Sequence, residues 1–575
     1  MSTDTLAQNR IDEWLTPTFD AQVHETIEKM KKDAPAELED SFYRDLEFGT
    51  GGMRGVMGVG TNRINSYTLG KSTQGLSNYL KKTFPGEAVK AVIAYDCRHN
   101  SDTLARTVAN VLSANGVEVF LFSSLRPTPE LSFAVRHLGC HCGIVLTASH
   151  NPPEYNGYKV YWQDGGQLVP PEDGEIISEI NSLNYADIQF TPKEDLIHMI
   201  DTEVDSVFIE ESVKNGCDAM LSEVDRNSVS VVFTPLHGTS VTMVPPVLEK
   251  AGYTHVHIVE AQAEPDGDFP TVKSPNPEET EALEMALQLA EKKNADIVIG
   301  TDPDCDRLGI AVRDTKGDLK LLNGNQTMIV MTWFLLENYK KDIGFEGNEF
   351  VASTIVSTPM LRKMAAAYGV EYKEVLTGFK WIAKLIKDFP NQKFIGGGEE
   401  SFGYMVGDFV RDKDAVTSTL LACEIVTKLK SERSSFYQKL LELYVDYGVY
   451  HEKLVSLVKK GQNGAAEIKQ MMVDLRNNAP TSINGSNVVT IEDYQNSTRR
   501  NMADGTTETL DIPKSNVLIF YTEDGSKIAA RPSGTEPKIK FYVSVQSPLD
   551  RTDNYPKVLQ QLQDKIDGIL KDLDI

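Results

Sequence analysis

The amino-acid sequence predicts an α/β protein of several domains that ends in a smaller α+β domain. Two observations lead to this prediction. The chain has 575 residues, which at about 150 residues per domain is enough for roughly four hydrophobic cores. Over most of that length, short β-rich runs alternate with helical patterns, as they do in parallel sheets flanked by helices.

The first predicted elements are helices. Ile11 and Leu15, and then Val23, Ile27 and Met30, recur at helical spacing ahead of the first glycine-rich motif. Three groups of predicted strands follow, over residues 91–95, 117–122 and 143–147, then 229–233, 255–259 and 296–300, then 350–356 and 393–395. Together they predict three comparable α/β units in series.

The last part of the chain has a different pattern. Residues 517–521, 527–530 and 539–545 predict antiparallel strands, the first two joined by an Asp-Gly turn. A helix follows, with an apolar face formed by Val558, Leu559, Leu562, Ile566, Ile569 and Leu573. We therefore expect domains over residues 1–212, 213–322, 323–455 and 456–575, with the polar stretch 459–478 near the last boundary.

The composition of the chain argues against several classes of function. With 41% hydrophobic and 25% charged residues, the chain resembles folded globular proteins and has no run of about 18 apolar residues, so we expect no membrane span. No apolar stretch follows a basic start, which predicts a cytoplasmic protein. The net charge of −25 argues against nucleic acid as a partner. A small phosphorylated substrate would need local Arg, Lys or a metal ion.

The six cysteines are too few and too scattered for a disulfide framework. Cys140-His141-Cys142 could supply metal ligands, but no second ligand pair follows. A strand of small buried residues is the better interpretation. No thiol is assigned a function.

A serine motif follows directly on the strand predicted at 143–147. It reads Ser149-His150-Asn151-Pro152-Pro153 and continues to Lys159. Two prolines fix φ and withhold backbone donors, so the serine is expected in a rigid loop where a nucleophile would be displayed. The alternative is a turn with a polar cap.

An acidic motif follows the strand predicted at 296–300. Asp302, Asp304 and Asp306 stand at alternate positions ahead of Arg307. In an extended segment their carboxylates would project to one side and repel one another unless a hard cation lay among them. Mg²⁺ suits such oxygen ligands, whereas the 12-residue calcium loop with a distal Glu is absent. The alternative is a solvated acidic turn.

Two further motifs suit a sugar phosphate. Residues 396–403 combine glycines with Glu399, Glu400 and Ser401, which can hydrogen-bond neighbouring hydroxyls. Residues 531–538, between two predicted strands, combine Arg531 with hydroxyls and with backbone N–H groups freed by Gly534, which suits a phosphate dianion. Turns without a ligand are the alternative in both places.

In their order and spacing, these four motifs resemble the α-D-phosphohexomutase family over essentially the whole chain. Residues 48–55, 95–98 and 377–380 agree with the family as well. The resemblance implies three related α/β domains with mixed sheets and a C-terminal α+β domain of the TATA-binding-like type. It also implies a central cleft to which the domains contribute, in order, the phosphoserine, metal, sugar-binding and phosphate-binding loops.

The resemblance also implies roles for residues. Ser149 would carry a phosphoryl group, and Asp302, Asp304 and Asp306 would hold one Mg²⁺ against it. Arg54, His150, Lys159 and Arg307 would orient the transferring group or relay protons, with His150 and Lys159 the acid–base candidates. The residues implied in substrate binding are Thr377, Gly378, Lys380, Glu399, Ser401, Arg531, Ser533, Gly534, Thr535 and Lys538.

The implied reaction is a transfer between two hydroxyls of one sugar phosphate through a sugar bisphosphate, which would also serve as activator. We expect glucose 1-phosphate, glucose 6-phosphate and glucose 1,6-bisphosphate, because residues 398–403 resemble the glucose-type loop. Pro303 in the metal loop differs from the Gly of many relatives, which should stiffen the loop without removing a ligand. Residues 403–409 after the sugar loop lack the histidine that several glucose-phosphate mutases carry there, so mannose and pentose phosphates stay open. A non-catalytic sugar-phosphate sensor and a hydrolase are the alternatives of a different class.

Overall fold

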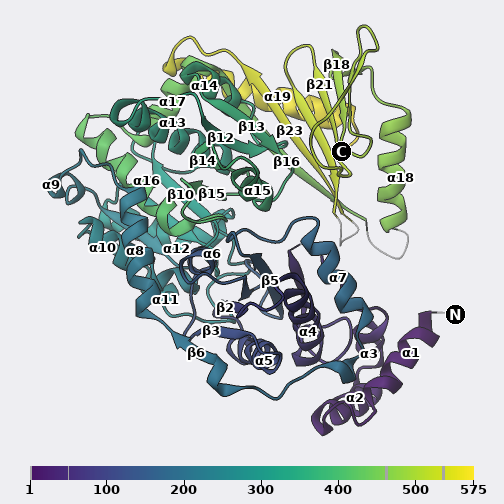
Figure 1. The fold of residues 1–575 in the computed structure, drawn as a ribbon. Coiled ribbons are helices and arrows are strands. Elements are labelled where there is room, and N and C mark those ends of the chain that lie inside the picture. The colour runs from purple at the N-terminus through teal and green to yellow at the C-terminus, as the bar shows by residue number, and fades with distance from the viewer. Residues whose placement is uncertain (1–2, 50, 460–463, 534–537) are drawn as a thin grey trace. The chain divides into compact units, whose positions relative to one another are not determined.

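A computed structural model describes residues 3–49, 51–459, 464–533 and 538–575 (Figure 1). The chain forms two compact units, one made of Met1–Thr327 and Phe379–Arg433 and the other of Met328–Gly378 and Ser434–Ile575. Among the described residues, no helix has the length and apolar character needed to cross a membrane.

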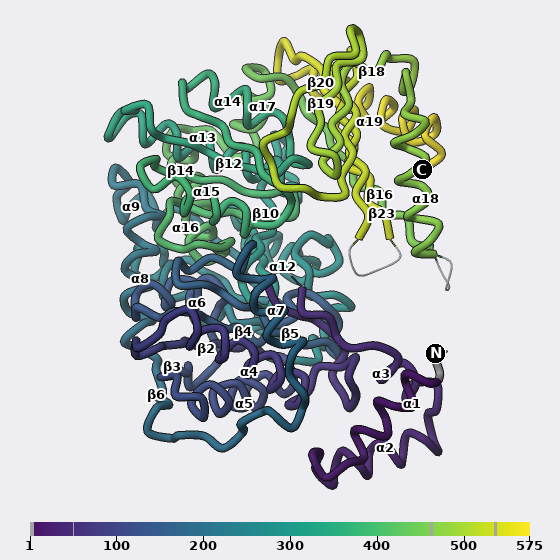
Figure 2. Tube along the Cα trace, turned by 45° about the vertical axis from the view of Figure 1, so that its right-hand side comes forward, coloured from purple at the N-terminus to yellow at the C-terminus, as the bar shows by residue number. Residues whose placement is uncertain are grey.

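The N-terminal helices are present as predicted. They are α1 (Thr3–Trp14), α2 (Ala21–Asp33) and α3 (Pro35–Phe42), which stand together in both views (Figures 1 and 2). The Asp20 carboxylate caps α2 by accepting from the backbone N–H of Val23 at 2.9 Å. Trp14, fully buried, joins Phe19 and Tyr67 in an aromatic cluster that fastens these helices to the first α/β domain.

The first α/β domain has a six-stranded mixed sheet. The strand order is β1 (Gly52–Val56), β5 (Tyr155–Trp162), β4 (Cys142–Leu146), β2 (Lys90–Tyr95), β3 (Glu118–Phe122) and β6 (Ile197–Ile200). β2, β3, β4 and β6 run parallel, whereas β5 is antiparallel to both β4 and β1. The helices of this domain are α4 (Ser66–Thr83), α5 (Ser101–Ala114), α6 (Thr128–His137) and α7 (Glu172–Ser182).

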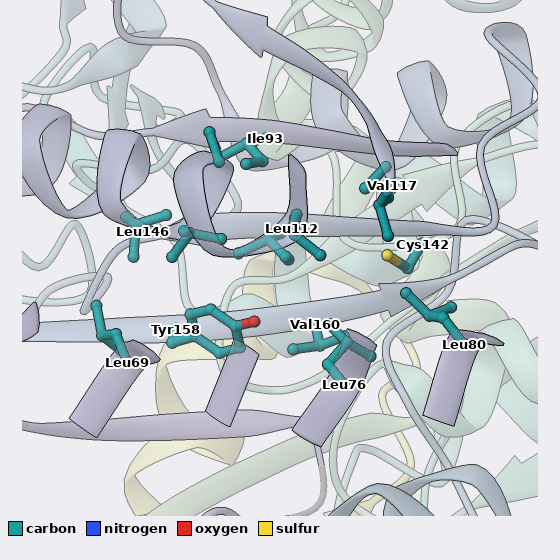
Figure 3. Close-up of a cluster of buried hydrophobic side chains, with 14 of the residues drawn as sticks. Leu69, Leu76, Leu80, Ile93, Leu112, Val117, Cys142, Leu146, Tyr158 and Val160 are labelled. Atoms are coloured by element: carbon teal, nitrogen blue, oxygen red, sulfur yellow. The ribbon is translucent and has the colours of Figure 1, made fainter. Parts of the chain in front are cut away.

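Its core lies between the sheet and helices α4, α5 and α7 (Figure 3). Ile93 of β2 and Leu146 of β4 meet Leu69 of α4 and Leu112 of α5 in this cluster. Val92, which alternates with Ile93, is also fully buried. Burial on both faces is typical of parallel strands covered by helices, and it explains the continuous apolar runs in the sequence.

The second α/β domain has a five-stranded mixed sheet. The strand order is β11 (Leu319–Leu321), β10 (Leu308–Arg313), β9 (Ile297–Thr301), β7 (Val231–Thr234) and β8 (Val256–Ile258). The helices are α8 (Thr202–Gly216), α9 (Glu223–Arg226), α10 (Val244–Ala251), α11 (Glu260–Ala263) and α12 (Thr280–Lys293). The first unit also contains α15 (Lys380–Asp388), the antiparallel strands β14 (Lys393–Gly398) and β15 (Tyr404–Val406), and α16 (Ala415–Ser431).

The second unit begins within α13 (Gly324–Asp342). It contains the parallel strands β12 (Glu349–Thr354) and β13 (Glu371–Val375), with α14 (Met360–Tyr368) and α17 (Phe436–Tyr447). An eight-stranded sheet follows in the order β16 (Val449–Val458), β23 (Lys538–Ser547), β22 (Lys527–Pro532), β21 (Leu518–Thr522), β18 (Ser486–Asp493), β19 (Thr498–Asn501) and β20 (Thr507–Thr509), with β17 (Ser482–Ile483) paired to β18. Two helices, α18 (Gly464–Asn477) and α19 (Tyr555–Asp572), complete the unit.

The predicted fold class is confirmed, with α/β domains that contain mixed sheets and a C-terminal antiparallel α+β domain. The predicted strands are present, with ends shifted by one to three residues. The polar stretch 459–478, expected near a domain boundary, contains α18. β16 spans the predicted boundary at 455/456, and the domain boundaries themselves stay predictions.

Candidate active site

Ser149 lies in the turn that follows β4. Its side chain is buried, with 2% of the residue exposed. Its φ of 52° is in the left-handed region, which costs a non-glycine residue about 1–3 kcal/mol and occurs chiefly at functional sites. Ser149 Oγ donates to Asp302 Oδ2 at 2.7 Å and lies 3.0 Å from His150 Nδ1. The serine is therefore displayed toward an acidic group in the rigid loop that the prolines predict.

One guanidinium holds this loop. Arg98 donates to the carbonyl oxygens of Ser149 at 2.6 Å and Asn151 at 2.5 Å, and to those of Pro152 at 2.8 Å and Tyr155 at 3.0 Å. Its side chain is fully buried beside Asp96. Four carbonyls bound to one planar donor fix the backbone on both sides of the nucleophile.

The three aspartates come together after β9. Their carboxylate oxygens lie within 4.8 Å of one another and all three side chains are buried. The extended segment predicted for them is wrong, because the chain turns. Cys305 has a φ of 58°, and its backbone N–H donates to the carbonyl oxygen of Asp302 at 2.9 Å. The turn, rather than alternation along a strand, makes the carboxylates converge.

Each carboxylate is held by specific donors. Asp302 Oδ1 accepts from the backbone N–H groups of Asp306 at 3.0 Å and Arg307 at 2.9 Å. Lys159 Nζ donates to Asp304 Oδ2 at 2.5 Å and to Asp306 Oδ2 at 3.0 Å. Lys413 Nζ lies 3.2 Å from Asp306 Oδ2.

Two oxygens of this cluster have no hydrogen-bond partner. Asp304 Oδ1 and Asp306 Oδ1 are buried and unpaired among the described residues. An unpaired buried carboxylate oxygen is costly in a folded protein, and it calls for a missing ligand. Three carboxylates with unused oxygens suit a hard cation such as Mg²⁺. The residues present therefore fit the predicted metal.

The charges in the cluster shift its pKa values in opposite directions. Burial raises the pKa of Asp302 well above its usual range, and the charges of Asp304 and Asp306 add to the effect. Burial acts in the same direction on Asp304 and Asp306. For these two carboxyls the nearby ammonium of Lys159 outweighs it, so that each pKa lies below its usual range.

The other predicted catalytic residues surround the cluster. Lys159 is buried on β5, with Arg54 on the neighbouring strand β1. Burial, reinforced by the charges of Arg307 and Arg54, lowers the pKa of His150 to about 3. The imidazole is therefore neutral near pH 7. Arg307 forms an ion pair with Glu278.

The predicted sugar loop lies in the first unit. Glu399, which directly follows β14, is buried with 6% of the residue exposed, and Ser401 is half-buried. Burial raises the pKa of Glu399 to about 7, although the charge of Lys413 opposes the shift. Lys380 begins α15, where burial lowers its pKa.

The remaining predicted residues belong elsewhere in the chain. Thr377, Gly378, Arg531, Ser533 and Lys538 are part of the second unit, and Gly534 and Thr535 lie outside the described residues. Their roles stay predictions. On β22, Arg531 stands directly opposite Lys540 of β23.

Three residues at this site were missed by the sequence analysis as functional residues. They are Arg98, Thr128 and Lys413, of which Thr128 donates its hydroxyl to Asp304 Oδ2 at 2.9 Å. Arg98 belongs to the segment 95–98, to which the sequence analysis gave no function. Lys413 lies among charged residues that follow the sugar loop. Thr128 carried no signal, because only the fold brings it to the aspartates.

Comparisons with known proteins show which sequences and folds the chain resembles. Family models for the phosphoglucomutase/phosphomannomutase α/β/α domains I, II and III match residues 45–187, 206–317 and 323–444. A phosphoglucomutase from Staphylococcus epidermidis (strain RP62A) is 38% identical over 92% of this chain and 95% of its own. One from Staphylococcus aureus (strain USA300) is 38% identical over 96% and 97%.

Solved structures show the same fold. A phosphoglucomutase/phosphomannomutase family protein from Burkholderia thailandensis matches with a TM-score of 0.65 at 20% identity, over 91% of this chain and 96% of its own. The open form of parafusin, a phosphoglucomutase from Paramecium, matches with a TM-score of 0.65 at 18% identity, over 92% and 96%.

Proposed function

Because the chain belongs to the phosphoglucomutase/phosphomannomutase family, we propose that it is a phosphosugar mutase that interconverts glucose 1-phosphate and glucose 6-phosphate. The observation that carries this proposal is the contact of Ser149 Oγ with Asp302 at the edge of a buried aspartate cluster. A nucleophile beside a site suited to Mg²⁺ is the arrangement that phosphoryl transfer needs. The relatives that are 38% identical carry the name phosphoglucomutase, which favours glucose over mannose or pentose phosphates.

The first half-reaction moves a phosphoryl group from Ser149 to the sugar. The bond between phosphorus and Ser149 Oγ breaks as a bond from phosphorus to a sugar hydroxyl oxygen forms. The hydroxyl loses a proton and Ser149 Oγ gains one. The second half-reaction is the same step in reverse with the other phosphate of the bisphosphate, so the serine ends phosphorylated again.

Two groups are placed for these proton movements. His150 Nδ1 lies 3.0 Å from Ser149 Oγ, within reach of the proton that this oxygen gains or loses, while burial lowers the pKa of His150 to about 3 and makes its imidazole a weak base. Burial alone would lower the pKa of Lys159, but Asp304 and Asp306 hold it above its usual range. Its ammonium therefore stays charged and can orient the transferring group or donate a proton. We assign these two residues the acid–base roles, with Arg54 and Arg307 as orienting cations.

Asp302, Asp304 and Asp306 would hold Mg²⁺ together with the phosphorylated Ser149. Bound there, the ion would neutralise charge on the transferring phosphoryl oxygens. The unpaired oxygens of Asp304 and Asp306 are the atoms available to it. Arg98 would keep Ser149 in place through both half-reactions, because its contacts are to backbone oxygens that phosphorylation leaves unchanged.

The sugar must bind in two orientations during one cycle. Glu399 and Ser401 would contact neighbouring hydroxyls in either orientation. Arg531, Ser533, Gly534, Thr535 and Lys538, with Thr377, Gly378 and Lys380, would bind the phosphate that is not reacting. Glucose 1,6-bisphosphate would be both the intermediate and the activator that rephosphorylates Ser149.

A parallel assay tests the reaction and its substrate. The 1-phosphates of glucose, mannose and ribose are each supplied with Mg²⁺ and the matching bisphosphate, and both the sugar 6- or 5-phosphate and free phosphate are measured. We expect the highest kcat/KM for glucose 1-phosphate, with little free phosphate. A higher kcat/KM for mannose or ribose phosphate would reassign the substrate. Free phosphate as the main product would make the protein a hydrolase, and binding without turnover would make it a sensor.

A further inference from the structure

Thr128 links the first α/β domain to the aspartate cluster of the second. It is the first residue of α6, which follows Pro127, and it is fully buried. Its hydroxyl donates to Asp304 Oδ2 at 2.9 Å, and its backbone N–H donates to the carbonyl oxygen of Asp304 at 2.9 Å. One residue therefore holds both the side chain and the main chain of a predicted metal ligand.

These contacts determine how the Asp304 carboxylate is turned. Oδ2 receives two donors, the Thr128 hydroxyl and the Lys159 ammonium. Oδ1 receives no donor from the described part of the chain and is buried. With Oδ2 occupied on two sides, the carboxylate is fixed with Oδ1 as its only unused oxygen. The start of α6 also carries the positive end of the helix dipole, which favours a carboxylate there.

The segment that leads into Thr128 is anchored by contacts of Arg126 that do not involve Asp304. Arg126 donates through Nε and Nη2 to the two carboxylate oxygens of Asp205 on α8, each at 2.9 Å. The backbone N–H of Arg126 donates to the carbonyl oxygen of Tyr95 at the end of β2. The segment that leads into α6 is thus anchored to a strand and to a helix.

We propose that Thr128 is a positioning residue for the metal site, and that its hydroxyl presets Asp304 for cation binding. The inference rests on the proposed function only in so far as that function places a divalent cation among the aspartates. Partners that orient a metal ligand are typically worth about 10–100-fold in metal affinity. Loss of the Thr128 hydroxyl leaves Lys159 as the one donor to Asp304 Oδ2, and the carboxylate can turn away from the productive orientation.

Calorimetric titration of the full chain with Mg²⁺ alone, in the absence of sugar, tests the proposal. Thr128→Val replaces the hydroxyl by a methyl group of similar size, and we expect it to weaken Mg²⁺ binding by about 10–100-fold. Thr128→Ser keeps the hydroxyl and should bind Mg²⁺ nearly as the wild type does. Thr419→Val is the matched control, because the buried Thr419 hydroxyl donates to the Ala415 carbonyl of its own helix. It should leave Mg²⁺ affinity unchanged.

A second readout separates positioning from general damage. For Thr128→Val, saturating Mg²⁺ should restore most of kcat, and KM for the sugar phosphate should change little, because the sugar loop is untouched. If the valine protein does not fold by circular dichroism, Thr128→Ala replaces it with the same expected loss. Wild-type Mg²⁺ affinity in the valine or alanine protein, an equal loss in Thr419→Val, or a loss in Thr128→Ser would each overturn the proposal.

The outcome is distinguishable from failure of the proposed function. If the wild type binds Mg²⁺ and Thr128→Val binds it weakly, the positioning role stands even when no sugar phosphate is turned over. If the wild type turns over glucose 1-phosphate with Mg²⁺ and all the Thr128 variants bind the ion equally, the function stands and the positioning role falls. If the wild type does not bind Mg²⁺, the metal site and the role of Thr128 fall together.

Discussion

Charge compensation at single residues explains why three carboxylates can be buried side by side. The ammonium of Lys159 reaches both Asp304 and Asp306, and Lys413 reaches Asp306. These ion pairs are almost fully buried, so the attraction is little screened and largely offsets the cost of desolvation. Asp304 Oδ1 and Asp306 Oδ1 have no hydrogen-bond partner among the described residues and could bind a further cation. The site is thus stable enough to fold and charged enough to attract a metal ion.

The raised pKa of Glu399 predicts that stability and substrate affinity depend on pH. Burial raises its pKa to about 7, against an ordinary value near 4.3 for Glu. Because the folded-state pKa is the higher one, ionised Glu399 costs stability, and that cost grows as the pH rises from about 4.3 and levels off above about 7. Sugar hydroxyls that donate to the ionised carboxylate would favour the charged form. Substrate affinity should therefore improve as the pH rises through about 7.

The test compares KM for glucose 1-phosphate in Glu399→Gln and the wild type between about pH 5.5 and 8.5. Titration of the substrate phosphate cancels in the ratio of the two KM values. The ratio is KM of Glu399→Gln divided by KM of the wild type. We expect it to rise about tenfold across this range, because a sugar that lowers the pKa of Glu399 by about one unit binds the ionised form more tightly by about 1.4 kcal/mol. Glu432→Gln, a change at an exposed residue of α16's C-terminal end, is the control and should give a constant ratio. A pH-independent ratio for Glu399→Gln would remove Glu399 from sugar binding.

At the scale of elements, the decisive unit is the segment from β4 to β5 with the residues that hold it. Ser149 follows β4, and Lys159 lies on the neighbouring antiparallel strand β5, from which its ammonium reaches the aspartates. Arg98, which follows β2, binds the carbonyl oxygens of the turn between them. The left-handed backbone of Ser149 persists because the neighbouring elements determine it from several sides.

Arg98→Lys tests that support. A lysine keeps the positive charge near Asp96 but cannot donate to four carbonyls in one plane, so Ser149 should shift relative to Asp302. Misplacement of a reacting group by about 1 Å can cost about 100-fold, and we expect a loss of that order in kcat with KM for glucose 1-phosphate little changed. Arg106→Lys, at a partly exposed arginine of α5 that pairs with Glu194, should keep wild-type kcat. Equal kcat values in the two variants would show that Arg98 is not needed to hold the serine.

The sequence predicted much of this, for identifiable reasons. Apolar runs buried on both faces marked β2, β4 and β9, and the residue types of Ser149 and the three aspartates indicated their chemistry. β5 was not predicted as a strand, because Pro152, Pro153 and Gly157 read as a loop. The turn at Cys305 was not predicted either, since a left-handed φ in a residue other than glycine leaves no pattern. Thr128 is remote from Asp304 in sequence, so only the packed fold joins them.

For the whole molecule, the proposed cycle needs residues from both compact units. The first unit contains Ser149, the aspartates and Glu399, whereas the predicted phosphate-binding residues around Arg531 belong to the second. Transfer at Ser149 alone would suffice for a phosphatase. A mutase must also keep the bisphosphate bound while the bisphosphate reorients, and we propose that role for the second unit.

Arg531→Ala tests this division of labour. Without the guanidinium, the non-reacting phosphate loses a charge-assisted contact, while Ser149 and the aspartates are unchanged. We expect a higher KM for glucose 1-phosphate and more frequent escape of the bisphosphate, which leaves Ser149 dephosphorylated. Added glucose 1,6-bisphosphate should restore turnover at concentrations that the wild type does not need. Unchanged KM and unchanged dependence on added bisphosphate would show that other residues bind the non-reacting phosphate.

The central claim is that Ser149 carries the phosphoryl group through the cycle, and one measurement addresses it directly. Enzyme labelled on its phosphoserine is mixed with a stoichiometric amount of unlabelled glucose 1-phosphate, and the label is followed in a single turnover. We predict that it leaves Ser149, enters glucose 1,6-bisphosphate and then appears in glucose 6-phosphate, and that Ser149→Ala takes up no label and loses turnover by several orders of magnitude. Label released as inorganic phosphate, or near-normal turnover by Ser149→Ala, would contradict the account.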